Sequence, residues 1–169
     1  GSNGYDRMVW NSQIVKDERG CGVKFSRTSV NGEQGFPGNL KLEIYYILTD
    51  NNELLMEYFA TTDKKTPINI TNHSYFNLCG NGNGTIKNHM LKIDGKKYLT
   101  VDSKLIPDGV LQNVKHTAFD FTKSKKIGQD IDKVGIGYDH CYVLSGDVSK
   151  PCAIVEEKST GIKMEVYTD

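Results

Sequence analysis

Apolar and polar positions alternate over short stretches of this chain, as they do in β-strands. Residues 41–48 (KLEIYYIL) place apolar side chains between Lys41, Glu43 and Tyr45, with Ile47 out of step. Residues 49–52 (TDNN) have the composition of a turn, and residues 53–60 (ELLMEYFA) read as a second strand. Because strand side chains alternate between two faces, this pattern predicts two antiparallel strands joined by a turn.

Two more stretches have the pattern of strand, turn and strand. In residues 89–101 (HMLKIDGKKYLTV), Asp94-Gly95 separates two alternating runs, and Asp-Gly is a strong hairpin signal. In residues 153–167 the turn residues are Ser159-Thr160-Gly161. FPGN (36–39) and IPDG (106–109) add turn chemistry. Helical spacing is confined to residues 123–135, where Gly128 limits it to one or two turns.

Short strands separated by Gly, Asn, Asp and Pro predict an all-β fold, either a sandwich or a barrel. No internal repeat or linker divides the sequence, so residues 1–169 are expected to form one domain. The first ten residues resemble a loop, and Asp169 directly follows a well-patterned strand. We therefore expect an incomplete domain, truncated at both ends, in which Gly1-Ser2 could be a cloning scar.

Charge and cysteine usage narrow the functional classes. Lys plus Arg and Asp plus Glu both number 21, so the net charge is zero and favours neither nucleic acid nor anionic membrane as a partner. The apolar runs are too short to span a membrane, which predicts a soluble protein. The four cysteines form no C-x-x-C pair, and reduced thiols in a cytosolic protein are expected.

The stretch TPINITNHSYFNLCG (66–80) raises the question of what His73 does. If a strand runs through Tyr75, His73 shares one face with Asn69, Thr71 and Tyr75. A strand-end histidine, a metal ligand and a proton donor remain open for His73 at this point. The four histidines show no ligand spacing, and no metal site is expected.

Asp139 and His140 are neighbours in GIGYDHCYVL (135–144) and would point to opposite faces of a strand. Spacing alone favours a structural Asp139 that accepts backbone hydrogen bonds after Gly137. The glycine-rich GNGNG (80–84) precedes a predicted strand rather than a helix, which favours a plain loop over a phosphate site.

Several motifs together resemble the galactose mutarotases, or aldose 1-epimerases. The resemblance rests on TPINITNHSYFNLCGNGNGTIKNHMLKI, YLTVDSKLIPDGVLQNVKHTAFDF and GIGYDHCYVL, with NGEQGFPGNL and STGIKMEVYT in the same order. It covers essentially the whole chain. It implies a β-supersandwich fold and the cofactor-free interconversion of α and β anomers of free aldoses such as galactose and glucose, by acid–base ring opening and reclosure. The expected setting is the cytoplasm, with the protein as a monomer or weak dimer.

The resemblance also assigns roles. His73 matches the acid that protonates the ring oxygen, a task that suits an imidazole because it titrates near neutrality. Ser74 and Tyr75 match substrate contacts, and Asp139 matches the carboxylate that binds sugar hydroxyls. His140 has no catalytic counterpart.

The family's general-base glutamate matches no residue of the chain, and neither do a glutamine, an Asn-Arg pair and a second histidine. In the family, further residues directly precede the segment that corresponds to GYDRMVW. Gly1-Ser2 could therefore belong to the native sequence instead of a cloning scar. Residues 1–169 alone are therefore expected to be inactive. The alternative is a non-catalytic, sugar-binding or regulatory module with the same fold.

Overall fold

The computed structural model describes residues 3–135 and 137–169, so Gly1-Ser2 lie outside the described residues. The chain divides into two compact units, Gly1–His73 and Ser74–Asp169, and each is described by itself. The assignment of residues 1–169 to one domain stays a prediction. Across the described residues the regular structure consists of antiparallel strands and single 3₁₀ turns, without an α-helix. None of the described helical segments is long and apolar enough to cross a membrane.

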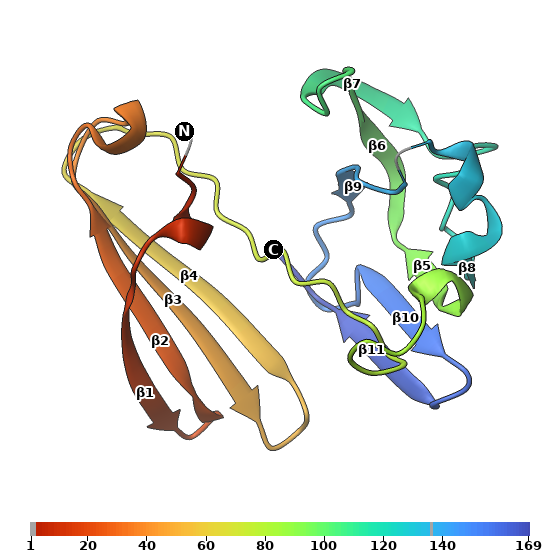
Figure 1. The fold of residues 1–169 in the computed structure, drawn as a ribbon, viewed down its shortest axis with the longest axis horizontal. Coiled ribbons are helices and arrows are strands. Elements are labelled where there is room, and N and C mark those ends of the chain that lie inside the picture. Colours follow the sequence, from red (N-terminus) through yellow and green to blue (C-terminus); the bar gives the residue numbers. More distant parts are fainter. Residues whose placement is uncertain (1–2, 136) are drawn as a thin grey trace. The chain divides into compact units, whose positions relative to one another are not determined.

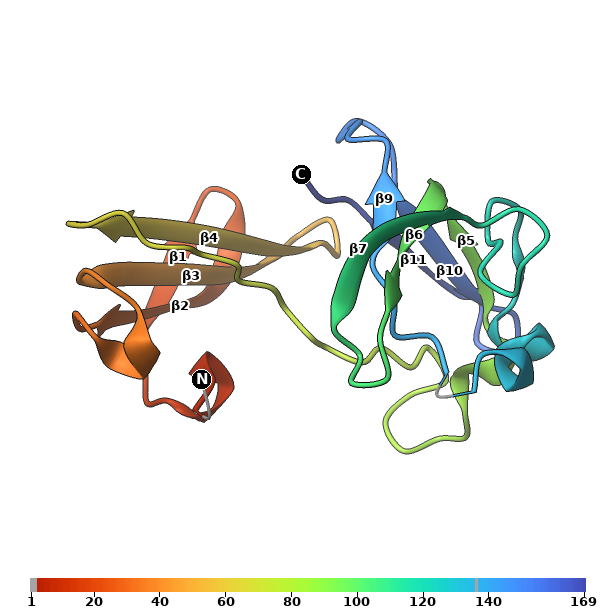
Figure 2. The same ribbon diagram turned by 90° about the horizontal axis from the view of Figure 1, so that it is seen from above.

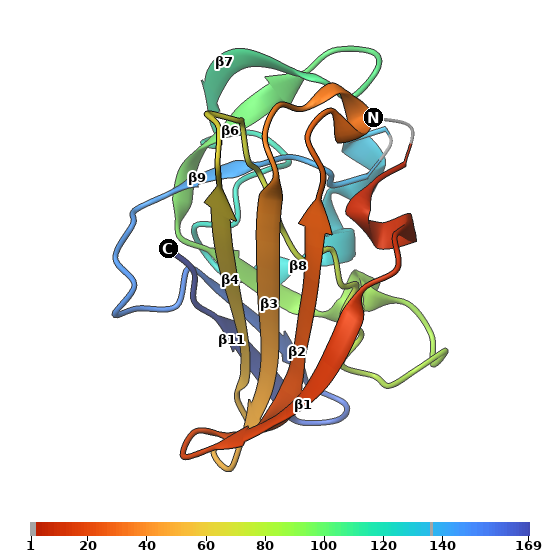
Figure 3. The same ribbon diagram turned by 90° about the vertical axis from the view of Figure 1, so that its left-hand side faces the viewer.

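The first unit is one four-stranded antiparallel sheet whose strands follow chain order (Figure 3). The predicted pair over 41–60 is confirmed, because β3 and β4 pair antiparallel around the turn at 49–53. In that turn Asn52 adopts a positive φ of 60°, a conformation that asparagine tolerates well. The unit consists of η1 (Tyr5–Arg7), β1 (Asn11–Asp17), β2 (Gly20–Ser29), η2 (Glu33–Gly35), β3 (Leu40–Thr49) and β4 (Leu54–Thr62).

Along β3, the more deeply buried side chains lie on one face of the first sheet near the start of the strand and on the other face near its end. Leu42 and Ile47 are both 1% exposed, although they point to opposite faces, whereas Leu48 is 61% exposed. Pairing along β2 and β3 continues without a register shift, so a bulge is not the cause. The face with Leu42 is instead buried at the start of the strand, and the face with Ile47 is buried near its end. The out-of-step Ile47 in the sequence pattern therefore marks a real core position.

The second unit contains two smaller sheets, with strand orders β11-β10-β5-β8 and β7-β6-β9 (Figures 1 and 2). The predicted hairpin over 153–167 is confirmed by the pairing of β10 with β11, and Gly161 has a left-handed φ of 72° in its turn. The unit consists of η3 (Ile86–Asn88), β5 (Met90–Ile93), β6 (Gly95–Val101), β7 (Pro107–Asn113), β8 (Lys125–Lys126), η4 (Ile127–Gln129), η5 (Ile131–Lys133), β9 (Tyr142–Leu144), β10 (Ala153–Glu157) and β11 (Ile162–Val166).

The predicted hairpin at Asp94-Gly95 is wrong. β5 pairs with β10 and β8, whereas β6 pairs with β7 and β9, so the chain passes from one sheet to the other at this point. The Asp94 N–H donates to the Cys152 carbonyl at 2.8 Å. Gly95 serves close packing, because a Cβ there would lie 3.1 Å from Cδ1 of Tyr142. A signal for a local turn thus marks a crossing between sheets.

The strand considered for residues 67–75, running through Tyr75, does not form, since residues 63–85 belong to no strand. Pro67 cannot donate a ladder hydrogen bond, and side chains replace the ladder further along. The Asn77 carboxamide accepts from the Cys79 N–H at 3.0 Å, and His89 accepts from the Leu78 N–H at 2.9 Å. Polar side chains that bind the nearby backbone compete with sheet pairing in this way.

Two smaller expectations have mixed outcomes. The short helical segment predicted within 123–135 is confirmed as η4 and η5, each one 3₁₀ turn. The turn expected at 106–109 lies earlier, where Asp102 accepts backbone hydrogen bonds from Lys104 and Ile106, and β7 begins at Pro107.

Candidate functional site

The boundary between the two units falls within the motif that contains His73. His73 is the last residue of the first unit and Ser74 is the first residue of the second. Ser74 and Tyr75 follow in irregular chain, and Tyr75 is exposed. The polar strand face that was expected to group His73 with Asn69 and Thr71 therefore does not form.

The backbone next to His73 is attached to the first sheet by Asn72. Its side-chain amide donates to the Tyr46 hydroxyl on β3 at 3.0 Å. Tyr46 packs edge-on against Phe25 of β2, with ring centroids 6.0 Å apart. Burial, followed by the neighbouring Tyr46, raises the pKa of Tyr58 on β4, which keeps that hydroxyl protonated. A rigid strand thus holds the residue that precedes His73.

Asp139 lies in the second unit, in a segment where buried and exposed positions alternate. Tyr138, His140 and Tyr142 are half-buried, whereas Asp139 and Cys141 are exposed. The expectation that Asp139 and His140 point to opposite sides agrees with this alternation. Residues 137–141 are not part of a strand, although the Leu99 N–H donates to the Cys141 carbonyl at 2.9 Å.

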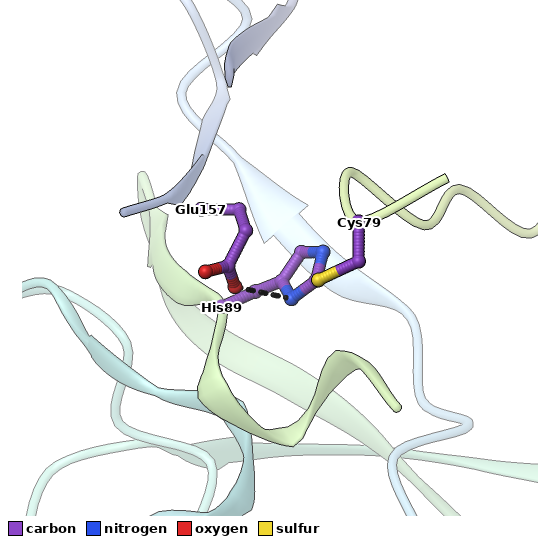
Figure 4. A group of neighbouring side chains, drawn as sticks. All are labelled: Cys79, His89 and Glu157. Atoms are coloured by element: carbon purple, nitrogen blue, oxygen red, sulfur yellow. Dashed lines mark ion pairs between the residues drawn. The ribbon is translucent and has the colours of Figure 1, made fainter. Parts of the chain in front are cut away.

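A third group of side chains, Cys79, His89 and Glu157, was not anticipated from the sequence (Figure 4). Their potential ligand atoms all lie within 4.8 Å of one another. His89 is 1% exposed and Glu157 is 6% exposed. The three residues come from distant positions, so no local spacing could have indicated them; Glu157 enters the group because β10 pairs with β5.

The hydrogen bonds of His89 decide what this group can do. Its Nε2 accepts the Leu78 N–H at 2.9 Å, and its Nδ1 lies 3.1 Å from Oε2 of Glu157. Because Nε2 accepts a hydrogen bond, the imidazole proton lies on Nδ1, beside Glu157 but without a well-aligned hydrogen bond to it, and this leaves no lone pair on Nδ1 for a metal. A metal-binding histidine normally donates its second N–H, whereas here the second nitrogen accepts. The arrangement favours a structural role.

Glu157 is the acceptor at the centre of this group. Its Oε1 accepts from the Ser159 N–H at 2.9 Å and from the Ser159 hydroxyl at 2.8 Å. These hydrogen bonds lower the pKa of Glu157, with His89 and the Cys79 thiol as smaller causes. The hydrogen bonds from Ser159 to Oε1 stabilise the β10–β11 turn. The Thr160 hydroxyl donates to the Leu78 carbonyl at 3.0 Å and joins this turn to the chain around Cys79.

Comparison with known proteins connects these features to a family. The family model for aldose 1-epimerase matches residues 1–169. This chain belongs to the aldose 1-epimerase family. It is 40% identical to the galactose mutarotase of Bos taurus over 99% of the chain, and 41% identical to the aldose 1-epimerase of Escherichia coli over the same share.

A solved structure supports the same relationship. Galactose 1-epimerase from Lactobacillus acidophilus matches with a TM-score of 0.81 and 33% sequence identity, over 90% of this chain and 46% of that one. The predicted mutarotase-like β fold is thereby confirmed. The chain spans about half the length of its curated relatives, 48% of the bovine protein and 49% of the bacterial one.

Within this member of the aldose 1-epimerase family, the predicted site residues divide between the units. His73 belongs to the first unit, and Ser74, Tyr75 and Asp139 belong to the second. Their roles stay predictions. The buried group at Cys79 has the hydrogen bonds of a structural group.

Proposed function

We propose that the full-length protein is an aldose 1-epimerase that interconverts the α and β anomers of free aldoses, with galactose and glucose as substrates. The observation that carries the proposal is about 40% identity to galactose mutarotases over 99% of the chain. The relatives named aldose 1-epimerase in bacteria support the same reaction class.

The proposed reaction transfers protons in two matched steps. A general base takes the proton of the C1 hydroxyl, while the His73 imidazolium gives a proton to the ring oxygen. The bond between C1 and the ring oxygen breaks, leaving the aldehyde and a new hydroxyl. After rotation about C1–C2 the hydroxyl attacks the other face of the carbonyl, and both protons return. The resemblance to the family implies that the base is a glutamate, and this glutamate has no counterpart among residues 1–169.

The remaining proposed residues bind the sugar rather than exchange protons. Asp139 would accept hydrogen bonds from sugar hydroxyls, and a charged acceptor forms stronger bonds than a neutral one. The exposure of Asp139 in the second unit is compatible with that role. Ser74 and Tyr75 would contact the same substrate next to the proposed acid.

We also propose that the protein works in the cytoplasm as a monomer or weak dimer. Its four cysteines, Cys21, Cys79, Cys141 and Cys152, are free thiols, which is typical of a reducing compartment. The expected partner is the free sugar, for which a chain of zero net charge needs no electrostatic steering.

Polarimetry of freshly dissolved α-D-galactose tests the proposed reaction. The full-length protein is expected to speed the approach to anomeric equilibrium far beyond buffer. Asp139→Ala is expected to lower turnover by roughly a hundredfold, because hydrogen bonds from sugar hydroxyls to a charged acceptor contribute about 1.5–3 kcal/mol each. Asp132→Ala, at an exposed position of η5, is the matched control and should retain wild-type turnover. Sugar binding by a wild-type protein without acceleration would instead identify a non-catalytic, sugar-binding protein.

A further inference from the structure

Asp139 lies in a segment that is attached to β6 only at its end, where the Leu99 N–H donates to the Cys141 carbonyl, and side chains contact the rest of it. Residues 137–141 lie outside every strand, and Gly137 enters the segment with a left-handed φ of 91°. A backbone of this kind can present Asp139 in many directions unless its neighbours are fixed. The half-buried residues on either side, Tyr138 and His140, are therefore the groups that hold the segment.

Phe119 is the centre of the cluster into which these neighbours point. Its ring stacks on Tyr98 at a centroid distance of 4.2 Å and an interplanar angle of 25°. His140 meets Phe119 edge-on at 4.5 Å, and Tyr138 does so at 5.7 Å. Aromatic pairs in stacked and edge-to-face arrangements at such distances stabilise each other beyond the effect of the area they bury.

Two hydroxyl groups attach the same segment to the backbone beside Phe119. The Tyr138 hydroxyl donates to the Ala118 carbonyl at 3.1 Å, and the Tyr142 hydroxyl donates to the Phe119 carbonyl at 2.9 Å. Burial is the main cause that raises the pKa of both tyrosines. Both hydroxyls therefore remain donors at neutral pH, on either side of Asp139 and His140.

His140 differs from the tyrosines because it also contacts the peptide of Asp139. The Asp139 N–H donates to Nδ1 of His140 at 3.4 Å, while the ring of His140 packs on Phe119. One imidazole thus joins the aromatic cluster to the backbone of the residue that carries the carboxylate. Phe119 and Tyr98 fix the ring, and the ring limits the directions in which the Asp139 peptide can turn.

We propose that His140 is a positioning residue that holds Asp139 toward the substrate. The proposal rests on the proposed function, in which Asp139 accepts hydrogen bonds from sugar hydroxyls. His140 acts through the Asp139 backbone and does not exchange protons with the sugar. A carboxylate that is free to turn binds hydroxyl groups less well, because ordering it on binding costs free energy.

A set of variants in the full-length protein separates the two contacts of His140. His140→Phe keeps a ring against Phe119 and removes the Nδ1 acceptor, whereas His140→Asn keeps an acceptor near that position and removes the ring. Each variant is combined with Asp139→Ala. Polarimetry over a range of α-D-galactose concentrations gives kcat and KM for each protein.

Both single variants are expected to raise KM by roughly tenfold, within the range of coupling between neighbouring groups, and to change kcat less. The same substitutions should change KM by less than about twofold when Asp139 is already alanine, since no carboxylate remains to be positioned. Equal losses with and without Asp139, or an unchanged KM in both single variants, would overturn the proposal.

Amide hydrogen exchange tests the positioning without relying on catalysis. The Asp139 N–H is expected to exchange faster in His140→Phe than in wild type, while the Leu99 N–H, which binds Cys141, keeps its rate. An unchanged Asp139 rate would contradict the proposal even in an inactive protein. A wrong proposed function is distinguishable from a wrong role for His140, because it would show as absent turnover in wild type or as full turnover in Asp139→Ala.

Discussion

The two units of this chain hold their functional segments in different ways. In the first unit, strands β1 to β4 pair in chain order, and Asn72 attaches the chain beside His73 to Tyr46 of that sheet. In the second unit several strands pair with distant partners, such as β5 with β10 and β6 with β9, and aromatic side chains contact the irregular segment around Asp139. The first arrangement depends mainly on backbone ladders and the second on packed side chains.

The two units should differ in how much stability they lose on single substitutions. A ladder between consecutive strands distributes its stability over many backbone hydrogen bonds, so a single side chain contributes only part of it. A cluster around one ring concentrates its stability, and β6, which crosses into that cluster, has register shifts in both of its pairings. The second unit should therefore respond more strongly to single substitutions in its interior.

Removal of the Phe121 ring, which is almost completely buried, should have the largest effect on stability. Phe121 is 1% exposed and packs edge-on against Tyr138 at 5.1 Å. Phe121→Ala is expected to destabilise the second unit by about 3–5 kcal/mol, as for other buried phenylalanines. Denaturant unfolding measures the loss, and Phe59→Ala on β4, where the ring is 54% exposed, is the control. Equal losses in the two variants would contradict the conclusion that the buried Phe121 ring stabilises the interior of the second unit.

A smaller loss is expected from a methyl group at the crossing between the second unit's sheets. In Gly95→Ala the new Cβ would lie 3.1–3.3 Å from Tyr142 and the Val143 carbonyl, which must move apart. Overpacking of this kind costs about 1–3 kcal/mol. Thermal unfolding should show a lower melting temperature. The rates of amide hydrogen exchange in β1 to β4 should stay unchanged. An unchanged melting temperature in Gly95→Ala would mean that β9 can move away from the new methyl group at little cost in free energy.

The smallest expected effect concerns acid stability. Hydrogen bonds from Lys133 and then Lys125 lower the pKa of Asp130 to about 2. Because the pKa is lower in the folded state, Asp130 stabilises the fold above the ordinary carboxyl range, and this contribution is lost as pH falls from about 4 to about 2. Asp130→Asn should flatten the fall in melting temperature over this window. An unchanged slope, as expected for exposed Asp132→Asn, would show that the lysines contribute nothing there.

The difference between the units also explains which elements the sequence predicted. The β3–β4 and β10–β11 hairpins were foreseen because their partners are adjacent in the chain and their turns have typical residues. Asp94-Gly95 misled because neither alternation nor turn residues specify a partner, and β5 pairs with the distant β10 instead. The irregular chain around His73 was missed because alternation does not reveal side-chain hydrogen bonds to distant residues, such as Asn72 to Tyr46 and Leu78 to His89.

For the candidate site, local pattern and family resemblance contributed different parts. Alternation correctly separated Asp139 from His140, although it favoured a structural role for the aspartate. The roles proposed for His73 and Asp139 came from resemblance. The group of Cys79, His89 and Glu157 could not be predicted, since it depends on a long-range strand pairing and on a nitrogen that accepts the Leu78 N–H.

The most direct test of the account is the turnover of the His73→Ala variant of the full-length protein, measured by polarimetry with α-D-galactose. If His73 supplies the proton to the ring oxygen, turnover should fall by roughly a hundredfold or more. His116→Asn is the control, because His116 is exposed and asparagine tolerates its positive φ of 66°. Near-wild-type turnover in His73→Ala would contradict the assignment of the acid.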